Sequence, residues 1–209
     1  MAKIHPNYCT LSSSSSSSSS FCSSQRETYT VWMKSLVLNS NGYTVYDSNG
    51  KVVFRIDNYD SKCSSEVYLM DLQGRVVCTI LRKKLLAFGL WDCHNDTDSS
   101  SRPWFKVGKT FDLFNHNKES VYDVIFGTNN DEQSKSSLNH RIQGSVHNLQ
   151  EFKIIDGQER VAAEVRRKRS PTSGVVLGED VLCVTVEPFV DHIFVMALVA
   201  IHGLIHHKM

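Results

Sequence analysis

The 209-residue sequence lacks the motifs by which the common enzyme classes are recognised. It has no GxSxG nucleophile turn, no P-loop and no GxGxxG dinucleotide motif, and isolated glycines such as Gly144 and Gly157 cannot form a phosphate cradle. The formal net charge is only +1, so no global field draws the chain to nucleic acid or to a membrane. We therefore expect a protein without catalytic activity or cofactor, whose charged partners bind at local clusters.

Metal-binding and membrane-spanning patterns are also missing. The six cysteines form no CxxC pair and no zinc spacing, which favours a reducing compartment and a cytoplasmic location. The uninterrupted apolar run over residues 193–201 is far shorter than the roughly 18 to 20 residues that cross a bilayer. No secretory leader with a basic start and a long apolar run precedes the serines at 12–20, so secretion is not expected.

The N-terminal segment is low in complexity. Serines occupy residues 12–20 and offer no apolar surface to offset the entropy lost on ordering. We expect a disordered tail over residues 1–27 and one domain over residues 28–209. A plastid transit peptide is the alternative, because the segment is Ser-rich and acid-poor, although Lys3 and Arg26 are its only basic residues.

Three later segments look like copies of one hairpin. Asp47 lies three residues before Gly50, and Asp71 lies three residues before Gly74, while the third copy has an altered turn at Gly157. Aspartate can bond to its own backbone two residues on, and glycine supplies the positive φ of a tight turn. Each copy therefore predicts strand, turn, strand. The copies cover residues 43–56, 67–80 and 152–165.

Further short runs of apolar or alternating residues predict additional strands and bring the total to about twelve, enough to close a barrel and remove exposed edges. These strands are expected at residues 30–38, 85–91, 104–107, 121–126, 141–146 and 181–186. Polar stretches at 92–101, 128–139 and 170–178 are expected to be loops.

The C-terminal segment predicts a helix. Pro188 suits a first helical turn, and no turn residue follows until Gly203. The polar positions Asp191, His202 and His206 fall on one narrow stripe, so the helix should be buried nearly all round. About 18 residues would give a core helix about 27 Å long. The predicted fold is thus mainly β, a closed antiparallel barrel of about twelve strands enclosing a hydrophobic C-terminal helix.

Several motifs in one order resemble the plant LURP-one-related family, whose fold is like that of the tubby C-terminal domain and the phospholipid scramblases. The resemblance covers residues 27–209. It rests on TVWMKSL at 30–36, VYDSNG at 45–50, RIDNY at 55–59, EVYLMD at 66–71, RKKL at 82–85, RPWF at 102–105 and SGVVLG at 173–178.

The resemblance implies a twelve-stranded barrel around a C-terminal helix and a role in plant defence, but no reaction. The cysteine clusters and acidic calcium segment of scramblases are missing here. Near the terminal helix the acids are Glu179, Asp180, Glu187 and Asp191, without the alternating ligands of a calcium loop. Lipid scrambling and calcium control are therefore not implied.

Two basic clusters are the candidate functional residues. Both follow predicted strands, and such clusters attract anionic lipid headgroups. Nuclear import, contact with nucleic acid and plain solvated strand ends are the alternatives. The proposed lipid-binding residues are Arg166, Arg167, Lys168 and Arg169 in the first cluster and Arg82, Lys83 and Lys84 in the second.

The leading hypothesis is a monomeric binding module that contacts an anionic phospholipid or phosphoinositide, and a protein partner, in the cytoplasm or at the periphery of the plasma membrane. A nuclear or membrane-tethered transcriptional regulator is the alternative, and an enzyme is a third class without a motif. No strong nucleic-acid signal is present, because Trp32, Trp91 and Trp104 lie in strand-like contexts that predict packing rather than base stacking.

Two further constellations have simpler explanations than a metal site. His202 and His206 share a helical face and His207 follows, but no third ligand or HExxH motif is present, so an exposed, frayed terminus is expected. Cys93 and His94 are adjacent on an extended chain, and their side chains should point to opposite faces.

The acidic stretch around Asp92 is the other constellation. It also holds His94, Asp96 and Asp98, but it lacks the glycine and the glutamate of a calcium loop. We therefore expect a solvated loop and no metal.

Overall fold

The computed structural model describes residues 21–34, 41–58, 66–83, 90–95, 102–109, 119–126, 140–145 and 148–206. Within these ranges the chain forms twelve strands and one helix. The elements are β1 (Glu27–Trp32), β2 (Asn41–Tyr46), β3 (Val52–Asn58), β4 (Glu66–Met70), β5 (Val76–Lys83), β6 (Leu90–His94), β7 (Phe105–Lys109), β8 (Glu119–Phe126), β9 (His140–Ser145), β10 (Asn148–Ile155), β11 (Val161–Arg167), β12 (Val181–Val186) and α1 (His192–Ile205).

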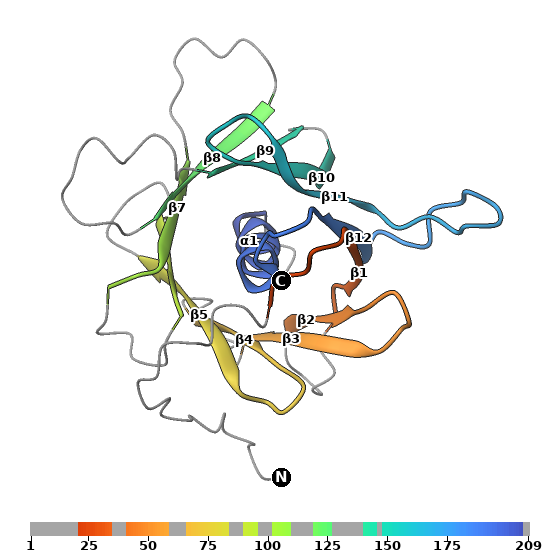
Figure 1. The fold of residues 1–209 in the computed structure, drawn as a ribbon, viewed down its shortest axis with the longest axis horizontal. Coiled ribbons are helices and arrows are strands. Elements are labelled where there is room, and N and C mark those ends of the chain that lie inside the picture. The colour runs from red at the N-terminus through yellow and green to blue at the C-terminus, as the bar shows by residue number, and fades with distance from the viewer. Residues whose placement is uncertain are drawn as a thin grey trace.

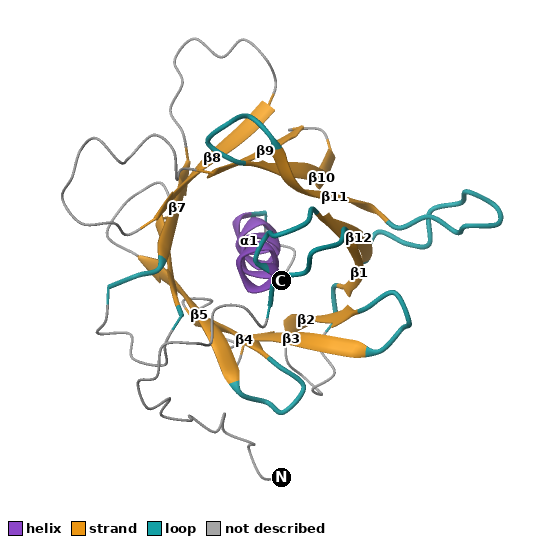
Figure 2. Ribbon diagram, viewed as in Figure 1, coloured by secondary structure: helices purple, strands orange, loops and turns teal. Residues whose placement is uncertain are grey.

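The twelve strands form a closed antiparallel barrel around α1, as the sequence predicted (Figure 1). Each strand pairs with its neighbours in chain order, and β1 closes the ring by pairing with β12. This closing pair runs in register from Glu27 opposite Val186 to Trp32 opposite Val181. Figure 2 shows the strands as a ring around the central helix.

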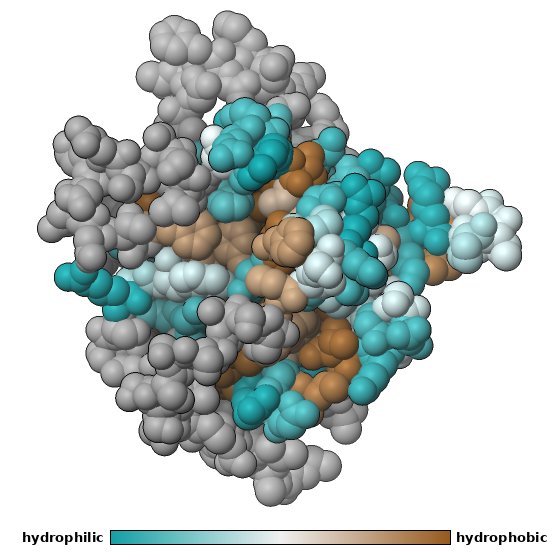
Figure 3. All heavy atoms as spheres, viewed as in Figure 1, coloured by the Kyte–Doolittle hydropathy of each residue, from teal (hydrophilic) through white to brown (hydrophobic). Residues whose placement is uncertain are grey.

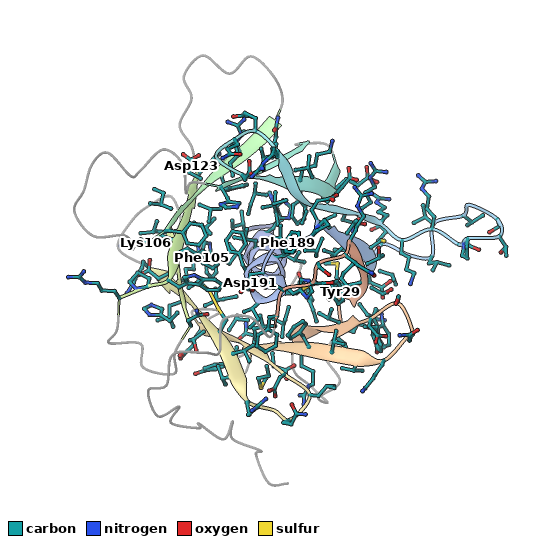
Figure 4. The ribbon with its side chains drawn as sticks, viewed as in Figure 1. Tyr29, Phe105, Lys106, Asp123, Phe189 and Asp191 are labelled. Carbon is teal, nitrogen blue, oxygen red and sulfur yellow. A yellow bond between two sulfur atoms is a disulfide. The ribbon has the colours of Figure 1, made fainter. Side chains whose placement is uncertain are left out.

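Alternating burial along the strands explains how the sequence forms this barrel. In β12, Leu182, Val184 and Val186 are buried while the residues between them are partly exposed. Phe105 on β7 points inward and its ring lies 5.1 Å from that of Phe194 on α1, whereas Lys106 points away (Figure 4). This period of two is that of a sheet with one buried face.

Helix α1 fills the barrel, and its residues from His192 to Leu204 are buried. It begins later than expected, so the prediction that Pro188 lies in its first turn is wrong. Phe189 has a φ of 64°, which is incompatible with a right-handed helix, and Asp191 is the N-cap, its side chain accepting a hydrogen bond of 3.0 Å from Phe194 N. The helix therefore has 14 residues and is about 21 Å long.

Gly203 lets the helix pass close to the barrel wall. A Cβ atom at this position would overlap the hydroxyl of Tyr43 on β2. The Tyr43 side chain is only 1 % exposed, so a Cβ at position 203 would have to displace a buried ring. Glycine costs about 1 kcal/mol relative to alanine inside a helix, and here the close approach explains its presence.

The three predicted hairpins share one turn geometry. In each, the aspartate side chain accepts hydrogen bonds from the backbone N–H groups two and four residues on. Gly50 and Gly74 both have a φ of 76°, as the sequence predicted. The third hairpin places Glu159, with a φ of 62°, at the equivalent position, while Gly157 is not in the left-handed region.

We expect Glu159→Gly to raise the free energy of unfolding by about 0.5–1 kcal/mol, because a side chain in the left-handed region is strained. The exposed pair of Glu159 with Arg141 is lost in this variant, but such pairs contribute little. Denaturant unfolding measures the change. Gln158→Gly is the matched control, because this neighbour is not in the positive-φ region, and it should lower stability. A loss of stability in Glu159→Gly would contradict the prediction.

Strand β6 corrects two expectations. Of the strand predicted at 85–91, residues 85–89 lie outside the described residues, and β6 continues beyond the predicted end to His94, so Asp92 and His94 are not in a solvated loop but are 5 % and 2 % exposed. Pairing of β6 with both β5 and β7 holds them in the wall. Cys93 faces the interior and forms a disulfide with Cys78 on β5, which the sequence spacing did not indicate, so the expectation of reduced cysteines is wrong for this pair.

Contacts with the barrel extend to residues before the expected boundary at residue 28. Phe21 packs against the core, and its carbonyl accepts a hydrogen bond of 3.0 Å from His192 N. The Ser23 carbonyl accepts a hydrogen bond from Phe189 N, and Arg26 pairs with Glu187 at 2.7 Å. Residues 21–26 therefore belong to the domain, whereas the serine run at 12–20 lies outside the described residues. Helix α1, the one helix in the described residues, does not combine the length and apolar character needed to span a membrane.

Candidate functional site: a basic groove on the barrel wall

The barrel topology places the two predicted basic clusters on opposite walls of one rim. Odd-numbered strands run in the same direction, so the ends of β5 and β11 lie at the rim where α1 ends. In the ring of twelve, β5 and β11 are separated by five strands on either side. Figure 1 shows β5 and β11 across the helix from each other. The two clusters therefore do not form one contiguous surface.

The cluster at the end of β5 is divided between two faces. The Arg82 guanidinium lies 5.7 Å from the ring centroid of Trp91, which is buried, so Arg82 covers the inner side of the rim. Lys83 points to the outer side and its Nζ lies 3.5 Å from a carboxylate oxygen of Asp92. Lys84 lies outside the described residues. The contacts of Arg82 with Trp91 and of Lys83 with Asp92 therefore explain where these two side chains lie.

The cluster at the end of β11 also alternates, but its members stay together. Arg166 points outward and pairs with Glu164 at 2.7 Å, while Arg167 lies opposite the inward-facing Leu182. Lys168 Nζ donates a hydrogen bond to the Thr30 hydroxyl on the outer wall. Arg169 begins a projecting hairpin, and its guanidinium donates to the Gly174 carbonyl at 3.3 Å.

These four residues line one open groove of about 920 Å³ across β9 to β12. Strand register explains its floor, because Gln143, Lys153, Glu164 and Thr185 are successive cross-strand neighbours on the outer face. The charged lining consists of the cations Lys153, Arg166, Arg167, Lys168 and Arg169 and the acids Glu151 and Glu164. Five positive and two negative charges give the groove a net charge of +3, three times that of the whole chain at +1.

Sequence reasoning missed the contribution of β10 and β12 to this groove. Lys153 and Thr185 lie far from residues 166–169 in the sequence, and only strand pairing brings them beside Glu164. Period-two alternation in the third hairpin was the available signal, since Lys153 lies between the buried Phe152 and Ile154. Alternation gives the outward direction of a side chain but not its cross-strand neighbour.

Cys183 is a potentially reactive group in the groove, and its environment keeps the thiol protonated. Burial raises the pKa of Cys183, and the opposing effect of Lys168 and Arg166 is smaller. A thiol becomes a strong nucleophile only when its pKa is lowered.

The lining of the groove offers cations, a hydroxyl group and an amide group, which are the groups that bind phosphate oxygens.

The histidines of α1 are placed differently from the sequence expectation. His202 is 4 % exposed and its ring stacks on Phe152 at a centroid distance of 3.9 Å, so the helix end is neither frayed nor exposed there. The ring of His206 lies 4.5 Å from that of His202, and His207 lies outside the described residues. In the part of the chain that the structure describes, no group of three metal-ligating side chains occurs.

A second open depression, of about 650 Å³, lies at the opposite rim where α1 begins. Aromatic rings of Trp104, Phe126, His140 and Phe194 line it, and Phe189 at its edge is 76 % exposed. Figure 3 shows brown, apolar atoms in the hollow centre of this face. Charged residues also line it, but three of the four are acids, Asp156, Glu187 and Asp191, and only Arg160 is basic, in contrast to the basic groove on the wall.

Comparison with known proteins gives a consistent result. A family model described as LURP-one-related matches residues 27–203. "Protein LURP-one-related 3" of Arabidopsis thaliana is 42 % identical over 188 residues, covering 88 % of this chain and 82 % of that protein. "Protein LURP-one-related 11" of the same plant is 39 % identical over 213 residues, covering 99 % of this chain and 89 % of that protein.

The fold has a solved counterpart. The X-ray structure of an Arabidopsis thaliana protein matches with a TM-score of 0.62 and 19 % identity, over 89 % of this chain and 94 % of that one. At this identity the match supports the barrel fold alone. The family model, by contrast, spans nearly the whole barrel and α1. The chain belongs to the LURP-one-related family.

Proposed function

We propose that this LURP-one-related domain is a non-catalytic binding module that contacts anionic phospholipid headgroups, phosphoinositides above all, through the basic groove. The observation that carries the proposal is that residues 166–169 line one groove together with Lys153. Each basic residue near an anionic membrane surface contributes about 1 kcal/mol to binding. Arginine forks match phosphate oxygens, which favours a headgroup with several phosphates.

The ion pairs within the groove do not oppose this function. Glu164 pairs with Arg166 at 2.7 Å and with Lys153 at 3.8 Å, and both cations are more than half exposed. Exposed pairs of this kind contribute at most about 1 kcal/mol. A phosphate group, which carries more charge than a carboxylate, can therefore replace Glu164 as the partner of either cation.

The test is sedimentation with phosphatidylcholine vesicles that contain or lack a phosphoinositide. We expect Arg166→Glu combined with Arg169→Glu to weaken binding at least tenfold, given about 1 kcal/mol per lost basic residue. Binding of the unchanged protein should also weaken as salt rises to about 0.15 M, where the screening length is about 8 Å.

The matched control is Lys51→Glu combined with Arg160→Glu, which changes the charge equally at the opposite rim. Arg160 loses an exposed pair with Asp156, which costs little stability. Equal binding by the groove variant and the control variant would contradict the proposal, as would a wild-type protein that ignores phosphoinositide vesicles. Thermal melting of each variant confirms that it is folded.

A further inference from the structure

The connection between β11 and β12 is a hairpin that projects beyond the barrel wall, at the right of Figure 1. Two aliphatic side chains on its second limb, between the turn and β12, are exposed, Val175 by 64 % and Leu177 by 53 %. In Figure 3 the hairpin shows teal atoms along its stem, a brown patch beside them and pale atoms at its outermost end. Basic and apolar groups therefore lie beside one another on a single projecting element.

Hydrogen bonding places these apolar side chains on the same face as a cation. Ser170 N donates to the Val175 carbonyl at 2.8 Å, and Leu177 N donates to the Lys168 carbonyl at 2.9 Å. Residues opposite each other in an antiparallel ladder share a face. Leu177 therefore lies opposite Lys168, and Val175 opposite Ser170, on one face of the hairpin.

The end of the hairpin also satisfies part of its own backbone. Gly174 N donates to the Ser170 carbonyl at 2.9 Å, and the Gly174 carbonyl accepts from the Arg169 guanidinium at 3.3 Å. Gly174 has a φ of 68°, which closes the turn. Backbone groups that are already bonded lose less when they leave water for an apolar environment.

We infer that the face of this hairpin that carries Val175 and Leu177 is a membrane-insertion element. Val175 and Leu177 enter the interfacial layer of an anionic bilayer, while Lys168, opposite Leu177, and Arg169, on the other face of the hairpin, extend their charges to the lipid phosphates. Long basic side chains keep their charge in the polar layer while their stems lie along apolar surface. The cations beside the apolar pair make an anionic bilayer the complementary surface. This inference rests on the function proposed for the groove, which lies on the barrel wall from which the hairpin projects.

The decisive variant is Val175→Ser combined with Leu177→Ser. We expect it to bind phosphoinositide vesicles at least tenfold more weakly, because the variant has lost the two apolar side chains that move from water into the bilayer on binding. Binding of a soluble inositol phosphate, measured by calorimetry, should be unchanged, since the groove is intact. Leu72→Ser combined with Ile125→Ser is the matched control, because these side chains are 46 % and 51 % exposed elsewhere on the barrel. It should bind vesicles like the wild type.

The outcomes separate this inference from the proposed function. If the Val175 and Leu177 variant binds vesicles like the wild type while the Arg166 and Arg169 variant does not, the insertion element is refuted and the groove stands. If the wild type binds neither vesicles nor inositol phosphate, the proposed function is refuted, and this inference is refuted with it. If the hairpin variant loses inositol phosphate binding as well, or abolishes a dimer seen by analytical ultracentrifugation without lipid, the hairpin has a different role and the inference is refuted.

A second readout measures insertion directly. Leu177→Trp should show a blue-shifted emission on phosphoinositide vesicles and quenching by brominated acyl chains, after subtraction of the signal from the three native tryptophans. The same tryptophan without vesicles should emit as a solvent-exposed residue. Unchanged emission on vesicles to which the protein is bound would place this face of the hairpin outside the bilayer and refute the inference.

Discussion

Replacing Ala200 with lysine should prevent the barrel from folding. Ala200 is completely buried in the middle of α1, and its neighbours along the helix are buried as well. An unpaired ammonium group in such an interior costs several kcal/mol, a large part of the 5–15 kcal/mol that stabilises a typical domain. We expect insoluble protein, or a protein without a cooperative thermal transition.

Gln158→Lys is the matched control for this variant. Gln158 is exposed in the turn between β10 and β11, so the same new charge there should leave the melting temperature nearly unchanged. Circular dichroism and thermal melting compare the two proteins. Recovery of Ala200→Lys with unchanged thermal stability would show that α1 does not form the core.

Acid should destabilise the domain through His202. Burial is the main cause that lowers the pKa of His202 to about 3, and the nearby His206 adds to the effect. In the unfolded chain His202 has its ordinary pKa near 6.5. Below that pH the imidazole therefore binds a proton in the unfolded state but not in the folded state. The stability is fully present above about pH 6.5 and is lost as pH falls toward 3, by about 2 kcal/mol at pH 5.

The variant that tests this effect is His202→Leu, which cannot titrate. The difference in unfolding free energy between wild type and His202→Leu should shift by about 2 kcal/mol in favour of the variant between pH 7 and pH 5. Val199→Ala, a buried position on the same helix without a titratable group, should show a difference that does not depend on pH. An equal pH dependence for wild type and His202→Leu would contradict the prediction.

The hairpin turns show which structural features the local sequence predicts and which it does not. Asp47 with Gly50, and Asp71 with Gly74, predicted both the turn and the positive φ, because these properties depend on residues close in the chain. The third turn keeps the geometry with Glu159 in the strained position, and no rule of composition predicts that choice. Here the pairing of β10 with β11 imposes the conformation on a residue that disfavours it.

The candidate site was predicted in part. The four basic residues at 166–169 were visible as a cluster, and the structure brings all of them to one groove. Arg82 and Lys83 lie at the same rim but outside this groove, because opposite walls of the barrel separate the two clusters and Lys83 pairs with Asp92. A cross-strand neighbour such as Asp92 comes from register, which is a property of paired strands rather than of either strand alone.

The sequence by itself determined the barrel with its central helix, since period-two alternation and an apolar C-terminal run leave no other way to bury those side chains. The tertiary structure alone decided which groups meet. It joined Cys78 to Cys93, placed Lys153 beside Glu164, began α1 at His192 rather than at Pro188 and left Val175 and Leu177 exposed. Such contacts depend on register and closure over long sequence separations, whereas burial patterns depend only on neighbours along the chain.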